Sequence, residues 1–170
     1  AAWDYILELF DGFEFPSAQL DAFLADEIDL DPGAAGLVAW CEKSGVPLRI
    51  LSDGFDYNLE RLRSLKGVAF DFHANRLRYE GDFWRIEAGH PDPSCGCGTG
   101  TCKAGLIAAH RARHPGAFCV HIGNGRVSDL CGALAADLVF AKDSLAPALA
   151  ERGAFYVPFQ SLHDVVAELE

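Results

Sequence analysis

Residues 103–141, which read KAGLIAAHRARHPGAFCVHIGNGRVSDLCGALAADLVFA, decide the fold. Helix-forming and strand-forming segments alternate here, so we expect helices at residues 103–113 and 127–135 and strands at residues 117–122 and 138–141. Alternation of this kind is typical of a parallel β-sheet that is flanked by helices. The stretch therefore predicts an α/β fold with a Rossmann-like sheet.

The same order of elements occurs upstream. An apolar helix is predicted over residues 34–44, ended by Gly45, and a short buried strand follows over residues 47–51. In such sheets ligands bind beyond the carboxyl ends of the strands. Ser52 and Asn124 each follow a predicted strand, so we expect them to share one crevice.

The remaining segments are predicted to surround this core. Residues 1–30 carry apolar side chains at helical spacing, and we expect them to form a small helical lid beside an α/β core over residues 31–170. Residues 68–87 alternate and are rich in aromatic residues, which predicts a β-hairpin excursion from the core. Residues 159–170 read as a final amphipathic helix with Ser161 at its start.

The composition excludes several classes of protein. Half of the 170 residues are apolar, which is typical of a folded domain, and the net charge of −11 argues against a nucleic-acid-binding surface. No apolar stretch approaches the roughly 20 residues of a membrane helix, and no signal peptide is recognisable, so we expect a cytoplasmic protein without a membrane partner. A small phosphorylated metabolite can still bind in a local basic pocket.

Three short segments carry residues that suit a phosphate. Ser52 and the amides of Asp53 and Gly54 would donate hydrogen bonds to one phosphate oxygen. Lys103, at the start of a predicted helix, would neutralise another oxygen. Taken singly, these features are an ordinary turn and a solvated lysine, but in this order they reinforce one another.

The third segment suits a metal ion. Asp129 and the side-chain oxygen of Asn124 would hold Mg²⁺, a hard cation that takes one or two carboxylates and keeps several waters. The alternative is a plain loop followed by a helix capped by Ser128.

The order and chemistry of these segments resemble the haloacid dehalogenase superfamily of phosphoryl-transfer enzymes. Residues 130–142, LCGALAADLVFAK, resemble the stretch after the acidic motif in its phosphoserine phosphatase-like branch. The run from Asp31-Pro32-Gly33 through SDGFDY and the cysteine-rich lysine segment to residues 156–159 is similar to the methylthioribulose-pathway phosphatases, which act on 2-hydroxy-3-keto-5-methylthiopentenyl-1-phosphate. The resemblance implies Mg²⁺-dependent hydrolysis of a small phosphate monoester, in methionine salvage.

The resemblance also assigns roles. It implies that Ser52 is the phosphate-binding hydroxyl, that Lys103 is the active-site lysine and that Asp129 is an acidic residue of the metal site. Asn124 stands where the family usually has aspartate, so the affinity for Mg²⁺ should be lower. The family's nucleophile motif, Asp-x-Asp-Gly-Thr, does not occur, and the segment at residues 9–13, LFDGF, does not replace it, because leucine cannot attack phosphorus.

Two hypotheses follow from this departure. The chain contains no methionine and no initiator, so we expect a phosphatase whose nucleophilic strand is absent from these residues. The alternative is a catalytically inactive pseudoenzyme of the same fold that binds a phosphometabolite or a partner.

A third hypothesis concerns the cysteines. Three thiols and one imidazole could bind Zn²⁺ together and make the chain a zinc-binding adaptor; these residues are His90, Cys95, Cys97 and Cys102. Cys-x-Cys is not the usual zinc spacing, however, and a disulfide is an alternative. The other cysteines lie in apolar patterns and are expected to be buried free thiols; they are Cys41, Cys119 and Cys131.

Overall fold

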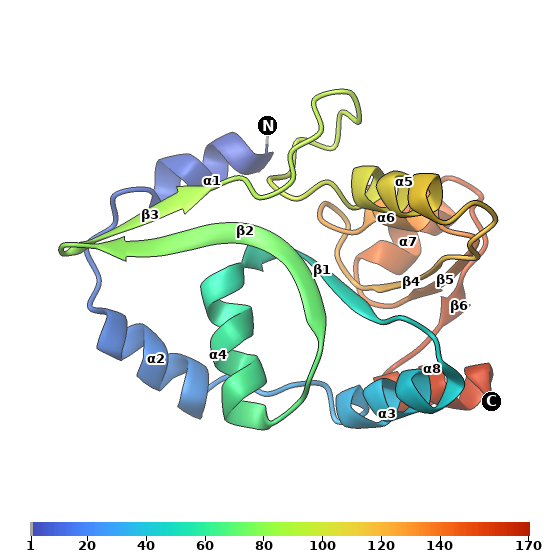
Figure 1. The fold of residues 1–170 in the computed structure, drawn as a ribbon. Helices are drawn as coiled ribbons and strands as arrows, with labels where there is room; N and C mark the ends of the chain where they lie inside the picture. The colour runs from blue at the N-terminus through green and yellow to red at the C-terminus, as the bar shows by residue number, and fades with distance from the viewer. Residues whose placement is uncertain (1) are drawn as a thin grey trace.

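The computed structural model describes residues 2–170, which form eight helices and six strands (Figure 1). The strands are β1 (Arg49–Phe55), β2 (Asp71–Glu80), β3 (Phe83–Glu87), β4 (Val120–Gly123), β5 (Leu138–Ala141) and β6 (Val157–Pro158). The helices are α1 (Ala2–Phe10), α2 (Ser17–Asp26), α3 (Ala34–Ser44), α4 (Asp56–Lys66), α5 (Lys103–Arg113), α6 (Leu130–Ala135), α7 (Leu145–Ala150) and α8 (Leu162–Leu169).

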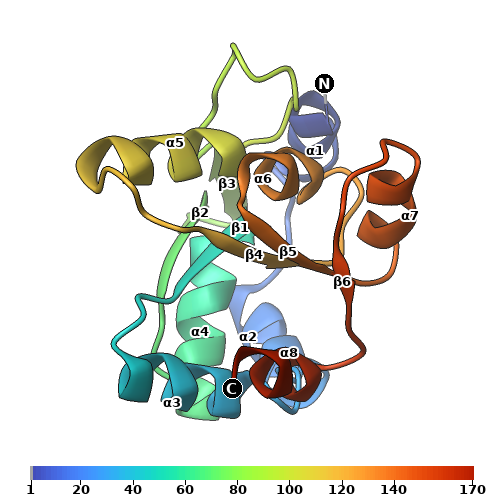
Figure 2. The same cartoon turned by 90° about the vertical axis from the view of Figure 1, so that its right-hand side faces the viewer.

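The C-terminal half contains the predicted parallel sheet. β5 lies between β4 and β6 and pairs with both in parallel. Helices α5, α6 and α7 cover one side of this sheet and α3 and α8 the other (Figure 2). Side chains of β5 alternate between the two sides, so that Phe140 packs with Leu37 and Val165 while Ala141 packs with Leu145. The predicted α/β fold is confirmed.

The second sheet contains the predicted hairpin. β2 and β3 pair antiparallel, and Leu77, Trp84 and Ile86 form a small core against which Trp3 and Ile6 of α1 pack. The first half of β2 also pairs in parallel with β1. The predicted hairpin is therefore present, and β2 joins it to β1 in one three-stranded sheet.

The ends of several helices follow from local sequence. Gly45 ends α3 in the left-handed conformation with φ 65°, and Ser161 begins α8 with a capping box to Asp164. The helix predicted over residues 127–135 begins later, at Leu130. The carboxylate of Asp129 accepts the backbone N–H groups of Asn124 and Gly125, which holds the preceding residues in a turn.

The two sheets are not joined by strand pairing within residues 2–170. β1 pairs only with β2, and β4 pairs only with β5, so each has one unpaired edge in the described chain.

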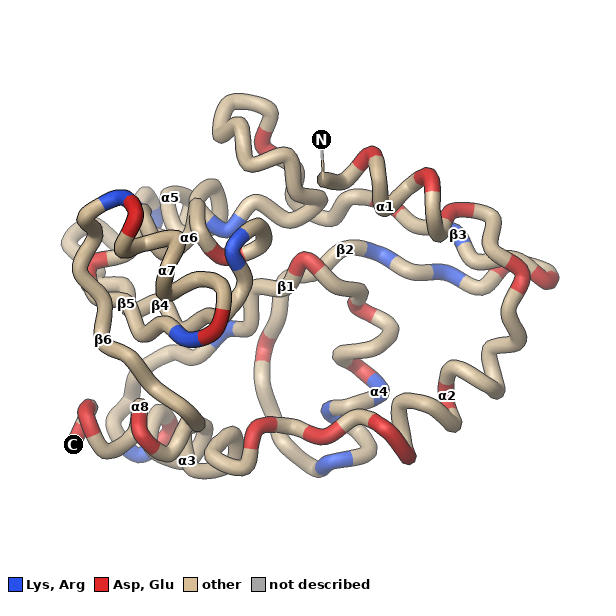
Figure 3. The backbone as a smooth tube through the Cα atoms, turned by 180° about the vertical axis from the view of Figure 1, so that it is seen from behind, with Lys and Arg blue, Asp and Glu red and all other residues tan. Residues whose placement is uncertain are grey.

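Acidic positions are frequent along α1 and on the segment that leads from α2 to α3 (Figure 3). Among the described helices, none has the length and apolar character to cross a membrane.

Candidate active site

A cleft of about 430 Å³ lies between β1 and β4. It brings together all six residues that the sequence predicts for the phosphate and metal site, although they come from three distant segments. The lining residues are Ile50, Leu51, Ser52, Asp53, Gly54, Lys103, Ile122, Gly123, Asn124, Ser128 and Asp129.

Ser52 lies on a bulge inside β1 rather than in a loop after it. The pairing of β1 with β2 shifts between Leu51 and Phe55, so the intervening residues do not follow the regular ladder. The Oγ atom of Ser52 accepts a hydrogen bond from the backbone N–H of Gly54 at 3.0 Å. Since a hydroxyl both accepts and donates, its proton remains available for a ligand oxygen in the cleft.

Asp53 serves the fold with its side chain. Its Oδ1 atom accepts hydrogen bonds from the backbone N–H of Thr101 at 3.1 Å and from Nδ2 of Asn75 at 3.2 Å. A carboxylate also repels a phosphate. The carboxylate of Asp53 therefore ties β1 to β2 and to the segment before α5, and it contributes no attraction for the ligand.

Asn75 and Thr101 support the site from behind, although the sequence did not point to either as a site residue. Both are fully buried, and the hydroxyl of Thr101 donates to Oδ1 of Asn75 at 2.9 Å. The same oxygen accepts the backbone N–H of Gly89 at 3.1 Å. An asparagine in the middle of an alternating apolar strand was the available signal, because a buried amide requires partners.

Lys103 and Asp129 form a buried ion pair at the floor of the cleft. The ammonium of Lys103 donates to Oδ1 of Asp129, and the two side chains are only 8% and 6% exposed. Oδ2 of Asp129 accepts the N–H groups of Asn124 at 3.0 Å and Gly125 at 2.7 Å. Burial alone opposes ionisation, but the neighbouring His121, Lys103 and Gly125 hold the pKa of Asp129 well below its usual range.

His121 is a buried neighbour of this pair that the sequence did not point to as a site residue. Its side chain is 7% exposed, and its Nε2 atom lies 3.7 Å from Oδ1 of Asp129 without a closer hydrogen-bond partner among the described residues. The imidazole therefore contributes to the polar surroundings of the carboxylate.

Two glycines allow these groups to approach. A Cβ atom on Gly123 would lie 2.8 Å from Cγ of Asp129, and one on Gly132 would lie 2.7 Å from Cβ of Lys103. Both distances are shorter than real carbon contacts. The close packing of α6 on α5 therefore depends on the absence of a side chain at Gly132.

The donor set fits a weakly held Mg²⁺ ion. A carboxylate has about four lone-pair sites. On Asp129, three of these sites accept hydrogen bonds, from Lys103, Asn124 and Gly125. Nδ2 of Asn124 donates to Asp143 at 3.3 Å, which brings a second carboxylate to this loop. Mg²⁺ is commonly held by one or two carboxylates together with waters and the phosphate of a substrate. Asp143 was not predicted as a site residue.

The predicted zinc group changes in one member. His90 lies against His73, with 3.1 Å between Nε2 and Nδ1, and it is not part of the cysteine group. Cys131, predicted to be a buried free thiol, lies instead with Cys95, Cys97 and Cys102. The packing of α6 against the start of α5 brings this fourth sulfur into the group.

Comparison with known proteins gives one family. The model of the haloacid dehalogenase-like hydrolase family matches residues 4–133. A 2-hydroxy-3-keto-5-methylthiopentenyl-1-phosphate phosphatase of Bacillus mycoides is 28% identical over 149 residues, which cover 87% of this chain and 67% of the relative. The phosphatase of the same name from Brevibacillus brevis is 32% identical over 153 residues, covering 87% of this chain and 66% of the relative. The chain thus spans about two thirds of the length of these relatives.

Solved structures agree on the fold. A phosphoserine phosphatase solved as a phospho-aspartyl intermediate analogue has a TM-score of 0.68 at 18% identity, covering 94% of this chain and 72% of the other. A phosphoserine phosphatase from T. onnurineus has a TM-score of 0.64 at 19% identity, covering 95% and 68%. At this level of sequence identity, the similarities show only that the chain has the fold of the phosphoserine phosphatases.

Proposed function

The chain belongs to the haloacid dehalogenase-like hydrolase family, and from this we propose that its cleft binds the phosphate of a small metabolite for Mg²⁺-dependent hydrolysis. The predicted enzyme class, a phosphatase of the haloacid dehalogenase type, agrees with the family match and with the names of the relatives. The observation that carries the proposal is the convergence of Ser52, Lys103 and Asp129 in one cleft.

The three residues supply complementary chemistry. The hydroxyl of Ser52 donates to a phosphate oxygen, and the ammonium of Lys103 offsets the negative charge of the phosphoryl group. In a partly buried cleft these interactions are stronger than in water, because the surrounding dielectric is lower. Asp129 holds the lysine in position through its ion pair.

Asn124 and Asp129 would hold the Mg²⁺ ion, with Asp143 beside them. When bound, the ion supplies positive charge that neutralises the oxygens of the phosphoryl group. With one amide in place of a carboxylate, this ion is held more weakly than at two carboxylates, and it depends on the phosphate to complete its coordination.

The nucleophile that the resemblance implies, an aspartate on a strand, is not among these 170 residues. The unpaired edges of β1 and β4 border the cleft, and a strand that paired there would present its side chains to Ser52 and Lys103. We place the nucleophile of the reaction on such a strand.

The substrate we propose is 2-hydroxy-3-keto-5-methylthiopentenyl-1-phosphate, after the relatives of that name. Residues 1–30 would act as the lid over the core of residues 31–170. The inactive alternative is not favoured, because the similar relatives are named as phosphatases.

Two measurements test the proposal. The affinity for inorganic phosphate with Mg²⁺, measured by calorimetry, should fall about tenfold or more in Ser52→Ala, because a hydrogen bond to a charged group is lost. Ser64→Ala, on the exposed side of α4, is the matched control and should bind as the wild type does. Absence of phosphate binding by the wild type would contradict the proposed site.

Hydrolysis of the proposed substrate with Mg²⁺ is measured separately, on a longer protein that also carries the strand we place between β1 and β4. Binding together with release of phosphate supports the hydrolase. If a protein that also carries the strand between β1 and β4 bound the substrate but released no phosphate, the hydrolase would be overturned in favour of the catalytically inactive pseudoenzyme.

A further inference from the structure

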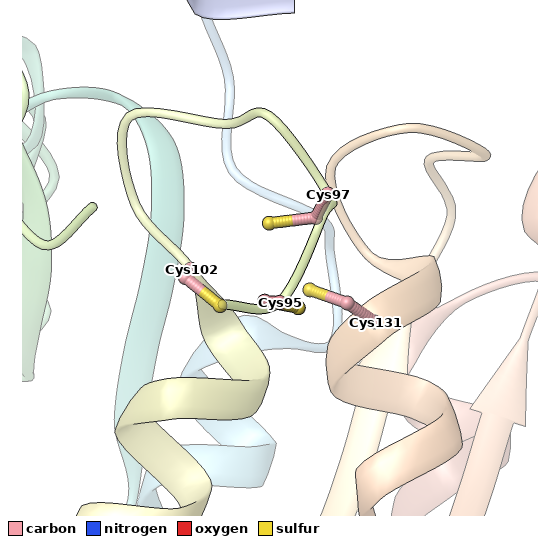
Figure 4. A group of neighbouring side chains, drawn as sticks. All are labelled: Cys95, Cys97, Cys102 and Cys131. Carbon is pink, nitrogen blue, oxygen red and sulfur yellow. The ribbon is translucent and has the colours of Figure 1, made fainter. Parts of the chain in front are cut away.

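Four cysteine thiols meet at one point outside the phosphate cleft. Cys95 and Cys97 lie on the loop before α5, Cys102 is the residue that caps α5, and Cys131 lies in the first turn of α6 (Figure 4). Their sulfur atoms all lie within 4.8 Å of one another. Side chains from two helices and a loop thus converge although Cys131 is far from the others in sequence.

The spacing of the sulfurs suits a single ion. In a tetrahedral zinc site the Zn–S bonds are about 2.3 Å, which places the sulfurs about 3.8 Å apart. The four thiols need to approach by only about 1 Å to reach this geometry, which side-chain rotation supplies. All six cysteines of the chain are free thiols in the structure, so no disulfide holds the group together.

The loop is built to turn its thiols inward. Gly96 and Gly98 adopt φ values of 71° and 68°, and this left-handed backbone lets the loop wrap tightly around the sulfurs. The backbone N–H of Gly105 donates to Sγ of Cys102 at 3.3 Å, and Oγ1 of Thr99 lies 3.2 Å from Sγ of Cys97. Such contacts stabilise a thiolate.

The acidity of Cys97 agrees with these contacts. Burial raises its pKa, but hydrogen bonds from Thr99 and the neighbouring thiols Cys102 and Cys95 outweigh burial and lower it to about 7. Cys102 and Cys131 are buried among other thiols, which raises the pKa of each. Without a cation, the thiols of Cys102 and Cys131 therefore resist ionisation.

We propose that Cys95, Cys97, Cys102 and Cys131 bind one Zn²⁺ ion in a closed tetrathiolate site. Thiolates are soft ligands that select zinc, and a site with four protein ligands leaves no open position for a substrate. The ion would therefore be structural. Its binding would release the thiol protons and couple metal binding to folding of the loop.

The position of this site gives it a consequence for the phosphate cleft. Cys102 immediately precedes Lys103, and Cys131 follows Asp129 by two residues. An ion that joins the starts of α5 and α6 would hold in register the two helices that carry the buried ion pair. The zinc site is thus inferred to position Lys103 and Asp129 without contacting a substrate.

The metal content of the protein tests the proposal directly. The chain is purified under reducing conditions without added zinc, and zinc per chain is measured by elemental analysis. We expect one ion per chain. After exchange into cobalt, we expect thiolate-to-cobalt charge-transfer absorption and intense visible bands of a tetrahedral site.

Matched cysteine variants identify the ligands. Cys131→Ser should weaken cobalt binding by about tenfold or more and lower the charge-transfer absorption, whereas Cys119→Ser, outside the group, should leave both unchanged. Wild-type protein that is fully reduced yet gives no cobalt charge-transfer spectrum would overturn the proposal, even if Cys131→Ser does not fold. Equal losses in both variants, or stoichiometric iron in place of zinc, would also overturn it.

Discussion

The ammonium of Lys103 donates a hydrogen bond to the carboxylate of Asp129 across 26 positions of sequence, and both side chains are almost completely buried. Each charge is compensated inside the protein rather than by water. The pair joins the first residue of α5 to the residue that precedes α6. Its removal should therefore affect both the stability of the fold and the shape of the cleft.

Lys103→Met should lower the free energy of unfolding by about 3–5 kcal/mol, because Asp129 would remain buried without its counter-charge. Urea denaturation measures this loss. Arg126→Met is the control, since the pair of Arg126 with Glu151 is half exposed and its loss should cost less than about 1 kcal/mol. Equal small losses in the two variants would contradict a buried pair.

Asn124→Asp should raise the affinity for Mg²⁺ by about tenfold, because it adds a charged oxygen to the proposed metal site. Without Mg²⁺ the variant should be less stable than the wild type, since the new carboxylate faces Asp143. Thermal unfolding with and without Mg²⁺ measures both effects. Gln19→Glu adds the same charge on α2 and should show no Mg²⁺-dependent gain; a gain equal to that of Asn124→Asp would argue against the site.

His73 and His90 should make stability depend on pH. Burial first, and then their mutual repulsion and nearby arginines, lower the pKa of His73, while burial and Arg76 lower that of His90. The folded state therefore binds fewer protons than the unfolded state, so stability rises with pH and is lost as the pH falls below the unfolded pKa of about 6.5.

Urea denaturation between about pH 8 and pH 5 measures this slope around the unfolded histidine pKa. In the double variant His73→Gln/His90→Gln the slope should be smaller, whatever its absolute stability. The control is His163→Gln, which leaves the pair intact and should keep the wild-type slope. An unchanged slope in the double variant would show that other groups carry the pH dependence.

Gly132→Ala should destabilise the protein by about 1–3 kcal/mol, because its Cβ would press on Lys103 and His121. Gly36→Ala, on the exposed side of α3, meets no atom within 4 Å and should instead stabilise by about 0.5–1 kcal/mol. Thermal or urea unfolding of both variants checks the difference in sign. Two variants of equal stability would contradict the close approach of α6 to α5.

Local patterns were enough for much of the fold. The helix predicted over residues 103–113 is α5, and Ser161 begins α8, because periodicity and caps act over a few neighbouring residues. α7 contains a proline and has only six residues, and β6 has two, so neither is long enough to show a period.

The site was predictable to the extent that its residues follow strands or begin helices. Lys103 begins α5 and Asn124 directly follows β4, and both line the cleft, whereas Ser52 was predicted to follow a strand but lies inside β1. The contacts of Asn75 and His121, and the place of the Cys131 thiol beside the other cysteines, were not predicted, because their partners lie far away in sequence. Only the packing of α6 on α5, and of β2 on β1, brings these groups together.

Within residues 2–170, β1 and β4 each have one edge that pairs with no other strand. Each edge carries backbone donors and acceptors that a strand from another copy can satisfy. These 170 residues on their own should therefore self-associate as their concentration rises, visible as increasing light scattering. A short peptide of β-forming sequence that paired with the free edges of β1 and β4 would keep the copies apart. The light scattering of the protein would then report whether these two edges are paired.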